Sequence, residues 1–160
     1  MNSRIRLIDD DRGARGDSPT CHPFDSEVLD VQGLSDRCLG NLELVERVLS
    51  RFETHLPREL AELERLMEVG DTDQLTLAAH RIKGSSSNVS AAGLQRVAAE
   101  IEDLTRAGRV EDIPAKFRNL REQWQRYVDC RAALRRGGDS AEGHSYAPAF
   151  EAAIASEKAL

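Results

Sequence analysis

A long apolar stripe at helical spacing runs between residues 42 and 67 and dictates much of the architecture. Its members recur every three or four positions: Leu42, Val45, Leu49, Phe52, Leu56, Leu60, Leu63 and Met67. Because an α-helix turns once in about 3.6 residues, these side chains share one helix face, which must pack against other elements. Pro57 lies within the stripe and has no backbone N–H to donate, so we expect the helix to kink or break there.

Three further amphipathic segments follow, joined by short turns that contain Gly or Asp. Gly70 is the expected C-terminal cap of the first helix, and the second begins near Asp71. Ser90 is the expected N-cap of the third, Gly108 marks its end, and Pro114 lies in the first turn of the fourth. Strong helix formers dominate, and β-branched or aromatic runs are nearly missing. The sequence therefore predicts an all-α fold, an antiparallel four-helix bundle.

The chain divides into one helical domain and two flanking segments. Residues 1–22 mix Arg, Asp, Gly, Ser and Pro without periodicity, which predicts a flexible N-terminal arm. The helical domain spans residues 23–136, and residues 137–160 form a C-terminal tail that we expect to be mostly flexible. Phe150 and Ile154 allow one short helix within that tail.

Charge and hydropathy exclude several classes of function. The net charge is −6, from 22 basic and 28 acidic residues that are interspersed, so no basic patch predicts nucleic-acid binding. No apolar run approaches the roughly 20 residues that span a bilayer, and no signal peptide is readable, so we expect a soluble cytoplasmic protein without membrane insertion. The three cysteines are widely spaced, which predicts neither a disulfide framework nor a metal site.

The predicted second helix places His80 on its outer face. The apolar stripe of that helix consists of Leu75, Ala78, Ala79, Ile82, Ser86 and Val89. At about 100° per residue, His80 lies about 160° from the centre of the stripe, so its ring points towards solvent rather than into the core. Gly84 lies one turn further along the same face, next to Ser87, with Lys83 at its flank.

A glycine inside a helix costs about 1 kcal/mol relative to alanine, so Gly84 needs a reason. Removing a side chain one turn from a histidine lets another macromolecule approach the ring; the alternative is a surface histidine beside a tolerated glycine. A solitary exposed imidazole is a nucleophile near neutral pH, and Lys83 can meet the charge of phosphate oxygens. No Ser–His–Asp or Cys–His constellation and no Gly-rich ATP loop is readable, which favours phosphoryl acceptance from an activated donor.

The stretch from Ala79 to Ser86, Ala-His-Arg-Ile-Lys-Gly-Ser-Ser, resembles the signature of histidine phosphotransfer (HPt) domains. In that family an Ala-His pair is followed by a variable residue, an aliphatic residue, Lys, Gly and two small residues. The resemblance extends over about residues 24–136 and includes Leu34, Cys38, Gly40, Asn41, Leu44, Val45, Phe52, Gly70, Asp71, Leu94, Ala98 and Glu102. It implies the family fold, a four-helix bundle with an accessory N-terminal helix.

The resemblance implies a role for each residue of the histidine face. His80 is the expected phosphoacceptor, through its Nε2 atom. Lys83 is expected to neutralise phosphate charge, and Gly84 to give a receiver domain access to the ring. The expected contacts of the partner surround the histidine: Thr76, Leu77, Arg81 and Ser87.

The resemblance also implies the reaction and its participants. The phosphoryl group would pass between His80 and an aspartate of a response-regulator receiver domain, with a hybrid sensor histidine kinase as a further partner. The Mg²⁺ for that step would belong to the receiver, so we expect a monomer with no metal and no cofactor of its own. The chain departs from the family at Ser90, where many members have Gly, which can shift the end of the histidine helix by a residue.

Three alternatives compete with this prediction. A scaffold or adaptor bundle without phosphate would be expected to lose the histidine. The helix pair of a sensor kinase usually has an acidic residue directly after the histidine and a proline shortly afterwards, whereas Arg81 follows here and the next proline is Pro114. The phosphoacceptor domain of a chemotaxis kinase is a close relative, but no ATP-binding domain is readable. We therefore expect a phosphocarrier without its own kinase domain rather than an independent enzyme, although each transfer is a phosphotransferase step.

Overall fold

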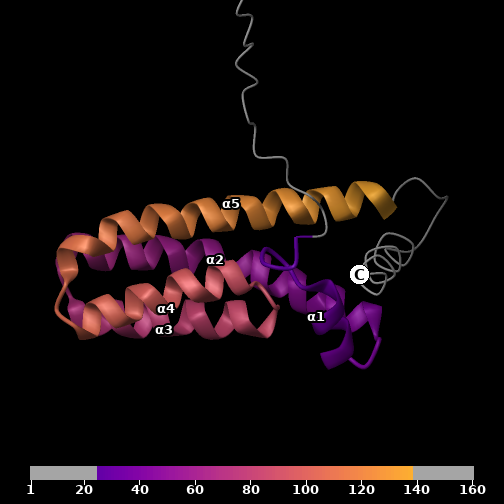
Figure 1. The fold of residues 1–160 in the computed structure, drawn as a ribbon, viewed down its shortest axis with the longest axis horizontal. Coiled ribbons are helices and arrows are strands. Elements are labelled where there is room, and N and C mark those ends of the chain that lie inside the picture. The colour runs from indigo at the N-terminus through magenta and orange to yellow at the C-terminus, as the bar shows by residue number, and fades with distance from the viewer. Residues whose placement is uncertain (1–24, 139–160) are drawn as a thin grey trace, which may run out of the picture.

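The computed structural model describes residues 25–138, so the predicted arm 1–22 and residues 139–160 of the predicted tail lie outside the described residues. The described part is all-helical, without a strand, as predicted (Figure 1). Its elements are α1 (Val31–Arg37), α2 (Leu42–Val69), α3 (Thr72–Asn88), α4 (Ala92–Arg106), the 3-10 turn η1 (Val110–Asp112) and α5 (Ile113–Gly138). The last helix continues past residue 136, the predicted end of the domain.

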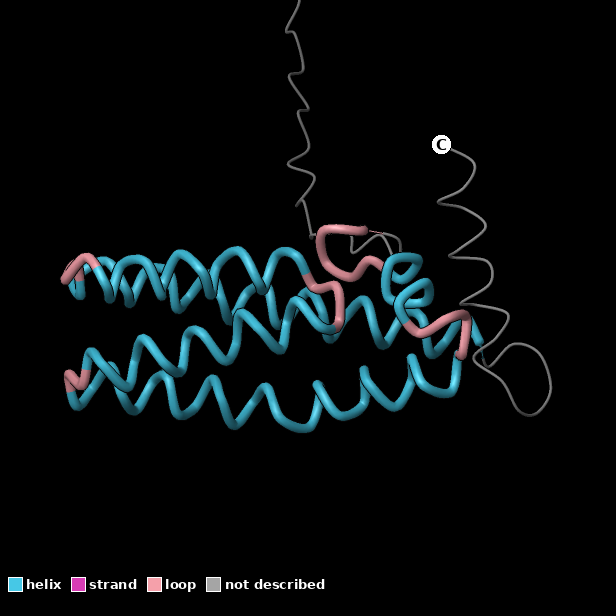
Figure 2. The backbone as a smooth tube through the Cα atoms, turned by 90° about the horizontal axis from the view of Figure 1, so that it is seen from below, coloured by secondary structure: helices cyan, strands magenta, loops and turns pink. Residues whose placement is uncertain are grey.

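The long helices α2 to α5 lie side by side, and the short α1 sits towards one end of the bundle (Figures 1 and 2). Short turns join α2 to α3 and α3 to α4, and the turn η1 precedes α5. α3 packs most extensively against α4, while α2 contacts α3 and α4 contacts α5. The pairing of α3 with α4 brings together residues that are far apart in the sequence, and it positions the site described below.

α2 is one continuous helix, so a break at Pro57 does not occur. Pro57 is exposed. It has no N–H for the backbone carbonyl one turn earlier, and that carbonyl can accept a hydrogen bond from water instead. Leu56 and Leu60, on either side of it, are buried and hold the helix against the core. Asn41 caps the first turn, where its side chain accepts a hydrogen bond from the Leu44 N–H at 3.0 Å.

Most of the predicted helix ends agree with the structure, and one does not. Gly70 caps α2 with a left-handed φ of 75°, and Asp71 caps α3 through its side chain. The prediction that Ser90 caps the third helix is wrong, because Ala91 is the N-cap of α4. Ser90 adopts a left-handed φ of 58° in the tight turn between α3 and α4, and its hydroxyl accepts a hydrogen bond from Arg37 of α1. This backbone conformation is the reason why glycine suits the position.

The predicted stripe of α2 lies in the core of the bundle. All its members are buried except Leu42 and Met67, which pack against the core from its edge. Phe52 meets two aromatic rings of α5 edge-on, with its centroid 5.3 Å from Tyr127 and 6.1 Å from Trp124. Those two rings stack on each other at 5.3 Å. These ring contacts join α2 to α5, and the burial of large aromatic side chains stabilises the junction.

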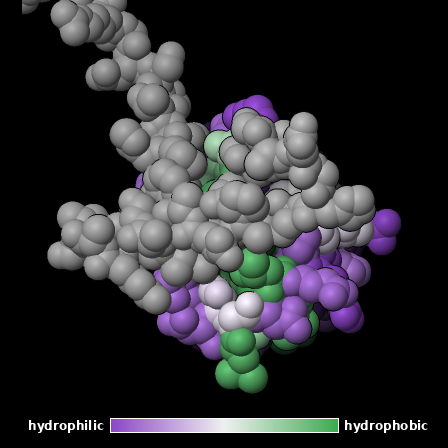
Figure 3. All heavy atoms as spheres, turned by 90° about the vertical axis from the view of Figure 1, so that its right-hand side faces the viewer, coloured by the Kyte–Doolittle hydropathy of each residue, from purple (hydrophilic) through white to green (hydrophobic). Residues whose placement is uncertain are grey.

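The end of the bundle that carries α1 exposes apolar side chains among hydrophilic ones (Figure 3). Leu39, in the turn between α1 and α2, is 93% exposed and adopts a left-handed φ of 54°. Leu44, in the first turn of α2, is also exposed. Within residues 25–138, no helix has the length and apolar character that crossing a membrane requires.

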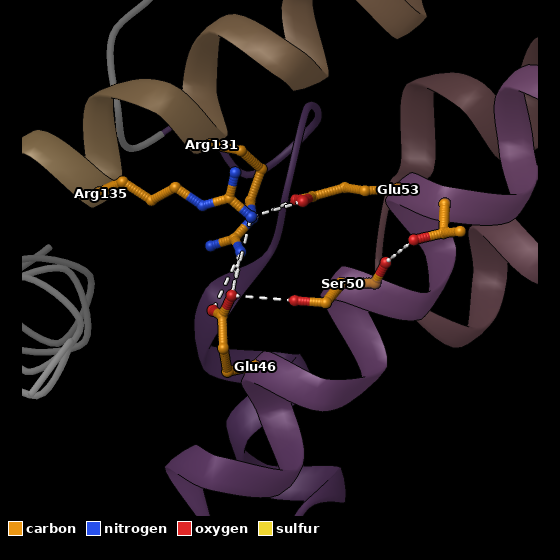
Figure 4. Close-up of polar contacts among 6 residues, drawn as sticks. Glu46, Ser50, Glu53, Arg131 and Arg135 are labelled. Atoms are coloured by element: carbon orange, nitrogen blue, oxygen red, sulfur yellow. Dashed lines mark hydrogen bonds and ion pairs between the residues drawn. The ribbon is translucent and has the colours of Figure 1, made fainter.

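A buried ion-pair cluster ties α5 to α2 (Figure 4). Arg131 of α5 is 1% exposed, and it donates to Glu53 at 2.6 Å and to both carboxylate oxygens of Glu46 at 2.9 Å. Arg135, one turn further, also donates to Glu53. Burial acts to lower the pKa of Arg131, but the hydrogen bond with Glu53 and the negative charges of Glu53 and Glu46 outweigh burial and raise it. The charged groups of this cluster therefore stabilise one another.

We expect Arg131→Leu to lower the free energy of unfolding by about 3–5 kcal/mol, because it removes the buried guanidinium that donates to two partly buried carboxylates. Arg135→Leu is the matched control, since that side chain is 43% exposed. Its loss should cost less than about 1 kcal/mol. Urea unfolding followed by circular dichroism measures both variants. Equal losses would show that the buried position of Arg131 does not matter to the fold.

Candidate functional site

α3 presents His80 on the surface, as predicted. The apolar face of the helix is buried, whereas the side chain of His80 is 58% exposed. Gly84, one turn further on, is exposed as well, and apart from the adjacent residues and backbone of its own helix, a Cβ atom added there would meet no atom of the described chain within 4 Å. The packing of this part of the chain therefore does not require a glycine, although glycine weakens the helix. The contacts of the described chain therefore give no reason for a glycine at this position.

Glu102 of α4 holds the ring of His80. The Oε1 atom of Glu102 lies 3.0 Å from Nδ1 of His80, and the side chain of Glu102 is 1% exposed. An ionised carboxylate can only accept a hydrogen bond, so in the neutral ring Nδ1 carries the proton and Nε2 keeps its lone pair. The expectation of a solitary imidazole is therefore wrong: the ring has a buried partner on the neighbouring helix.

Sequence reasoning gave Glu102 no role beyond its resemblance to the third helix of the family. The sequence did contain a signal, because Glu102 is a charged residue on the buried face of its helix. Ala98 lies one turn before it and Thr105 nearly one turn after it, and all three are buried. A charged residue is almost never fully buried without a partner, so Glu102 required one. The periodicity of this helix alone could not tell that the partner lies on α3.

Two cations share Glu102 with His80. The Nζ atom of Lys83 lies 2.6 Å from Oε2 of Glu102, and Arg106, one turn later on α4, pairs with Oε1. Burial acts to raise the pKa of Glu102. The hydrogen bonds from Lys83 and His80, together with the charges of Lys83 and Arg106, outweigh burial and hold that pKa below the ordinary glutamate value. Glu102 is therefore charged at neutral pH.

The four predicted partner contacts lie on the same helix as the histidine: Thr76, Leu77, Arg81 and Ser87. Leu77 and Arg81 are exposed, and Ser87 is half-buried. Thr76 is half-buried, and its hydroxyl lies 2.8 Å from that of Thr105, a hydrogen bond that ties α3 to α4. Thr76 and Leu77 also line one shallow hollow between these helices. Of the four, Leu77 and Arg81 are the most accessible to a partner.

The fold and these side chains define a helical module with an exposed histidine that a buried carboxylate orients. The Hpt domain family matches residues 47–130, more than half of the chain, and the chain therefore belongs to this family. Its members are phosphocarrier modules of two-component phosphorelays, which carry out histidine phosphotransfer without kinase activity and interact with receiver and kinase domains. No curated protein and no solved structure gave a significant match to the chain.

Glu102→Gln should lower the free energy of unfolding at neutral pH by about 1–3 kcal/mol, because charged hydrogen bonds at a buried carboxylate are lost. The pKa of Glu102 is lowered in the folded protein, so this stabilisation is present above the ordinary glutamate pKa of about 4.3. It disappears as the pH falls through the lower pKa of the folded state. The difference between the native protein and the variant should therefore shrink on acidification. Urea midpoints over a pH series measure it, and a difference independent of pH would contradict the expectation.

Proposed function

We propose that the chain carries a phosphoryl group on Nε2 of His80 and exchanges it with the aspartate of a response-regulator receiver domain. The observation that carries this proposal is the hydrogen bond from Nδ1 of the exposed ring to the buried Glu102. Because Nδ1 is protonated, Nε2 is the ring nitrogen with a lone pair to use as a nucleophile. A hybrid sensor histidine kinase is the second partner that we propose.

The transfer itself needs no additional base. The lone pair of Nε2 attacks the phosphorus of the receiver's aspartyl phosphate, the P–O bond to the aspartate breaks, and its electron pair leaves on the carboxylate. Positive charge develops on the ring during this step, and Glu102 faces that charge through the N–H of Nδ1. The reverse steps return the phosphoryl group to an aspartate, so the exchange runs in either direction.

We propose that Lys83 and Arg106 bind the phosphoryl oxygens. Both cations form ion pairs with the carboxylate of Glu102, and the same carboxylate contacts the ring of His80. The two cations therefore lie near the ring. Their side chains are 32% and 58% exposed and are long enough to turn from Glu102 towards a phosphoryl group. Lysine supplies a compact charge, and arginine a fork of donors that matches phosphate. We therefore add Arg106 to the predicted site.

The surface beside His80 suits a macromolecular partner. Gly84 leaves the next helical turn without a side chain, and its surroundings are open. Leu77, 52% exposed, offers an apolar contact on the other side of the ring, and Arg81 offers a positive charge to the acidic phosphorylation site of a receiver. We propose that the Mg²⁺ of the reaction belongs to the receiver and that this chain contributes no metal or cofactor.

The proposal extends to the architecture and the setting of the protein. Helices α2 to α5 would form an antiparallel four-helix bundle, with α1 as the accessory N-terminal helix. The short turns between long helices that lie side by side support this arrangement (Figure 2). We further propose that the protein acts as a cytoplasmic monomer.

His80→Gln should abolish phosphoryl uptake and leave the fold intact, because the side chain is largely exposed. The purified chain and the variant are incubated with radiolabelled phosphorylated receiver domains and Mg²⁺. Acid-labile, base-stable label on the native chain alone is the expected result, since that stability pattern marks phosphohistidine. Equal label on both proteins would place the phosphoryl group on another residue.

Gly84→Gln should block transfer from a receiver by at least about tenfold, because its side chain would occupy the space where the partner must approach. Gly84→Ala is the control: its Cβ meets no neighbour, and the helix should gain up to about 1 kcal/mol. Phosphoramidate, a donor too small to be excluded, should label His80 in both variants. Normal transfer to Gly84→Gln would show that Gly84 does not serve access.

A further inference from the structure

The hydrogen bond between Glu102 and His80 bears on the phosphorylated state as well. Once a phosphoryl group occupies Nε2, the other ring nitrogen is either protonated or bare. With a bare Nδ1, breaking the N–P bond would release an imidazolate anion, which is a poor leaving group. With a protonated Nδ1, the ring leaves as neutral imidazole. The proton on Nδ1 therefore decides how readily the phosphoryl group moves on.

We propose that Glu102 keeps the proton on Nδ1 of His80 throughout the phosphorylated state, so that the phosphoryl group stays transferable. This inference rests on the proposed phosphorylation of His80. In the onward step the N–P bond breaks and its electron pair stays on Nε2, while an aspartate oxygen of the receiver forms the new P–O bond. The proton remains on Nδ1 from beginning to end. Glu102 touches no reacting atom and is a positioning residue.

The cations around Glu102 make this role stronger after phosphorylation. In the free protein, Glu102 divides its charge among Nδ1 of His80 at 3.0 Å, Lys83 at 2.6 Å and Arg106. The positive charges of Lys83 and Arg106 disfavour a positive charge on the nearby ring. A phosphoryl group on Nε2 attracts them to its own oxygens, which leaves the carboxylate to the protonated ring. The phosphoryl group therefore draws the cations away from Glu102, and the carboxylate then interacts mainly with the N–H of Nδ1.

The carboxylates on the other side of α3 are engaged elsewhere. On α2, Glu59 accepts a hydrogen bond from Ser85 at 3.3 Å, and Glu62 pairs with Arg65 at 2.7 Å. Neither forms a hydrogen bond or an ion pair with the His80 ring, whereas Glu102 lies directly against Nδ1. Within the described residues, Glu102 is therefore the carboxylate placed to control the protonation of this nitrogen.

Burial makes the contact persistent. The side chain of Glu102 is 1% exposed, so water competes little for its oxygens. The hydroxyl of Thr105 donates to the backbone carbonyl of Glu102 at 2.8 Å and also lies 2.8 Å from the hydroxyl of Thr76 on α3. These bonds hold α3 and α4 in register where the ring meets the carboxylate. A surface glutamate would not keep the same geometry.

The test uses the full chain with isotope-labelled histidine, phosphorylated by phosphoramidate so that no partner protein is needed. Nitrogen NMR follows the protonation of Nδ1 as the pH is raised, and His80→Gln identifies the signal. In the native protein, Nδ1 should lose its proton about one to two pH units higher than in Glu102→Gln, the size expected for a charged hydrogen bond.

Two variants make the comparison specific. Glu100→Gln is the matched control, since it is the same substitution on the same helix at a carboxylate that pairs with Lys116 at 2.6 Å. It should titrate like the native protein. Glu102→Asp keeps the charge and should restore part of the shift. Transfer from Glu102→Gln to a receiver should be about tenfold slower than native at alkaline pH and approach the native rate at acidic pH.

The outcomes separate this inference from the proposed function. Equal titration of Nδ1 in the native protein and in Glu102→Gln, with phosphohistidine formed in both, would overturn the role of Glu102 alone. A failure to form phosphohistidine at His80 would overturn both proposals. If Glu102→Gln does not fold, the native protein decides: Nδ1 must stay protonated to a higher pH than in free Nε2-phosphohistidine in the same buffer.

Discussion

A buried carboxylate needs donors, and Glu102 finds them in the site itself. Removing a carboxylate from water costs several kcal/mol unless hydrogen bonds and opposite charges offset the loss. His80, Lys83 and Arg106 supply both. The contacts that keep Glu102 charged also orient the imidazole, select its tautomer and gather two cations beside it. The packing of α3 against α4 and the chemistry of the surface therefore depend on the same side chain.

Arg131 is a second buried ion, and the comparison shows why Glu102, and not Arg131, borders the candidate site. Arg131 is enclosed by Glu46 and Glu53, whose side chains are 27% and 19% exposed, and these contacts join α5 to α2. Glu102 is equally buried, but its partners reach solvent, with His80 58% exposed. A buried charge whose partners lie between two helices stabilises the fold. A buried charge with exposed partners organises a surface.

Gly84, inside α3, and Ser90, in the turn that follows α3, are opposite cases of residue type and backbone conformation. Ser90 adopts a left-handed φ that glycine would favour, because the turn into α4 is tight, yet it is not glycine. Gly84 is glycine in ordinary helical geometry with open space around it. Ser90 therefore adopts a backbone conformation that the turn requires, and its hydroxyl accepts a hydrogen bond from Arg37. The glycine at position 84 is explained by the proposed approach of a receiver and not by packing within the described chain.

The sequence by itself determined the helices, the buried stripe of α2 and the outward direction of His80, because helical periodicity is a local property of the chain. It also indicated Gly84 and Lys83, which lie within one turn of the histidine. It did not reveal the contact between His80 and Glu102, which depends on which face of α4 meets α3. It was wrong about the cap at Ser90, since the backbone of that turn is set by the two helices that it joins. Tertiary packing alone decided that the exposed histidine has a buried partner, because only packing brings residues of different helices within hydrogen-bonding distance.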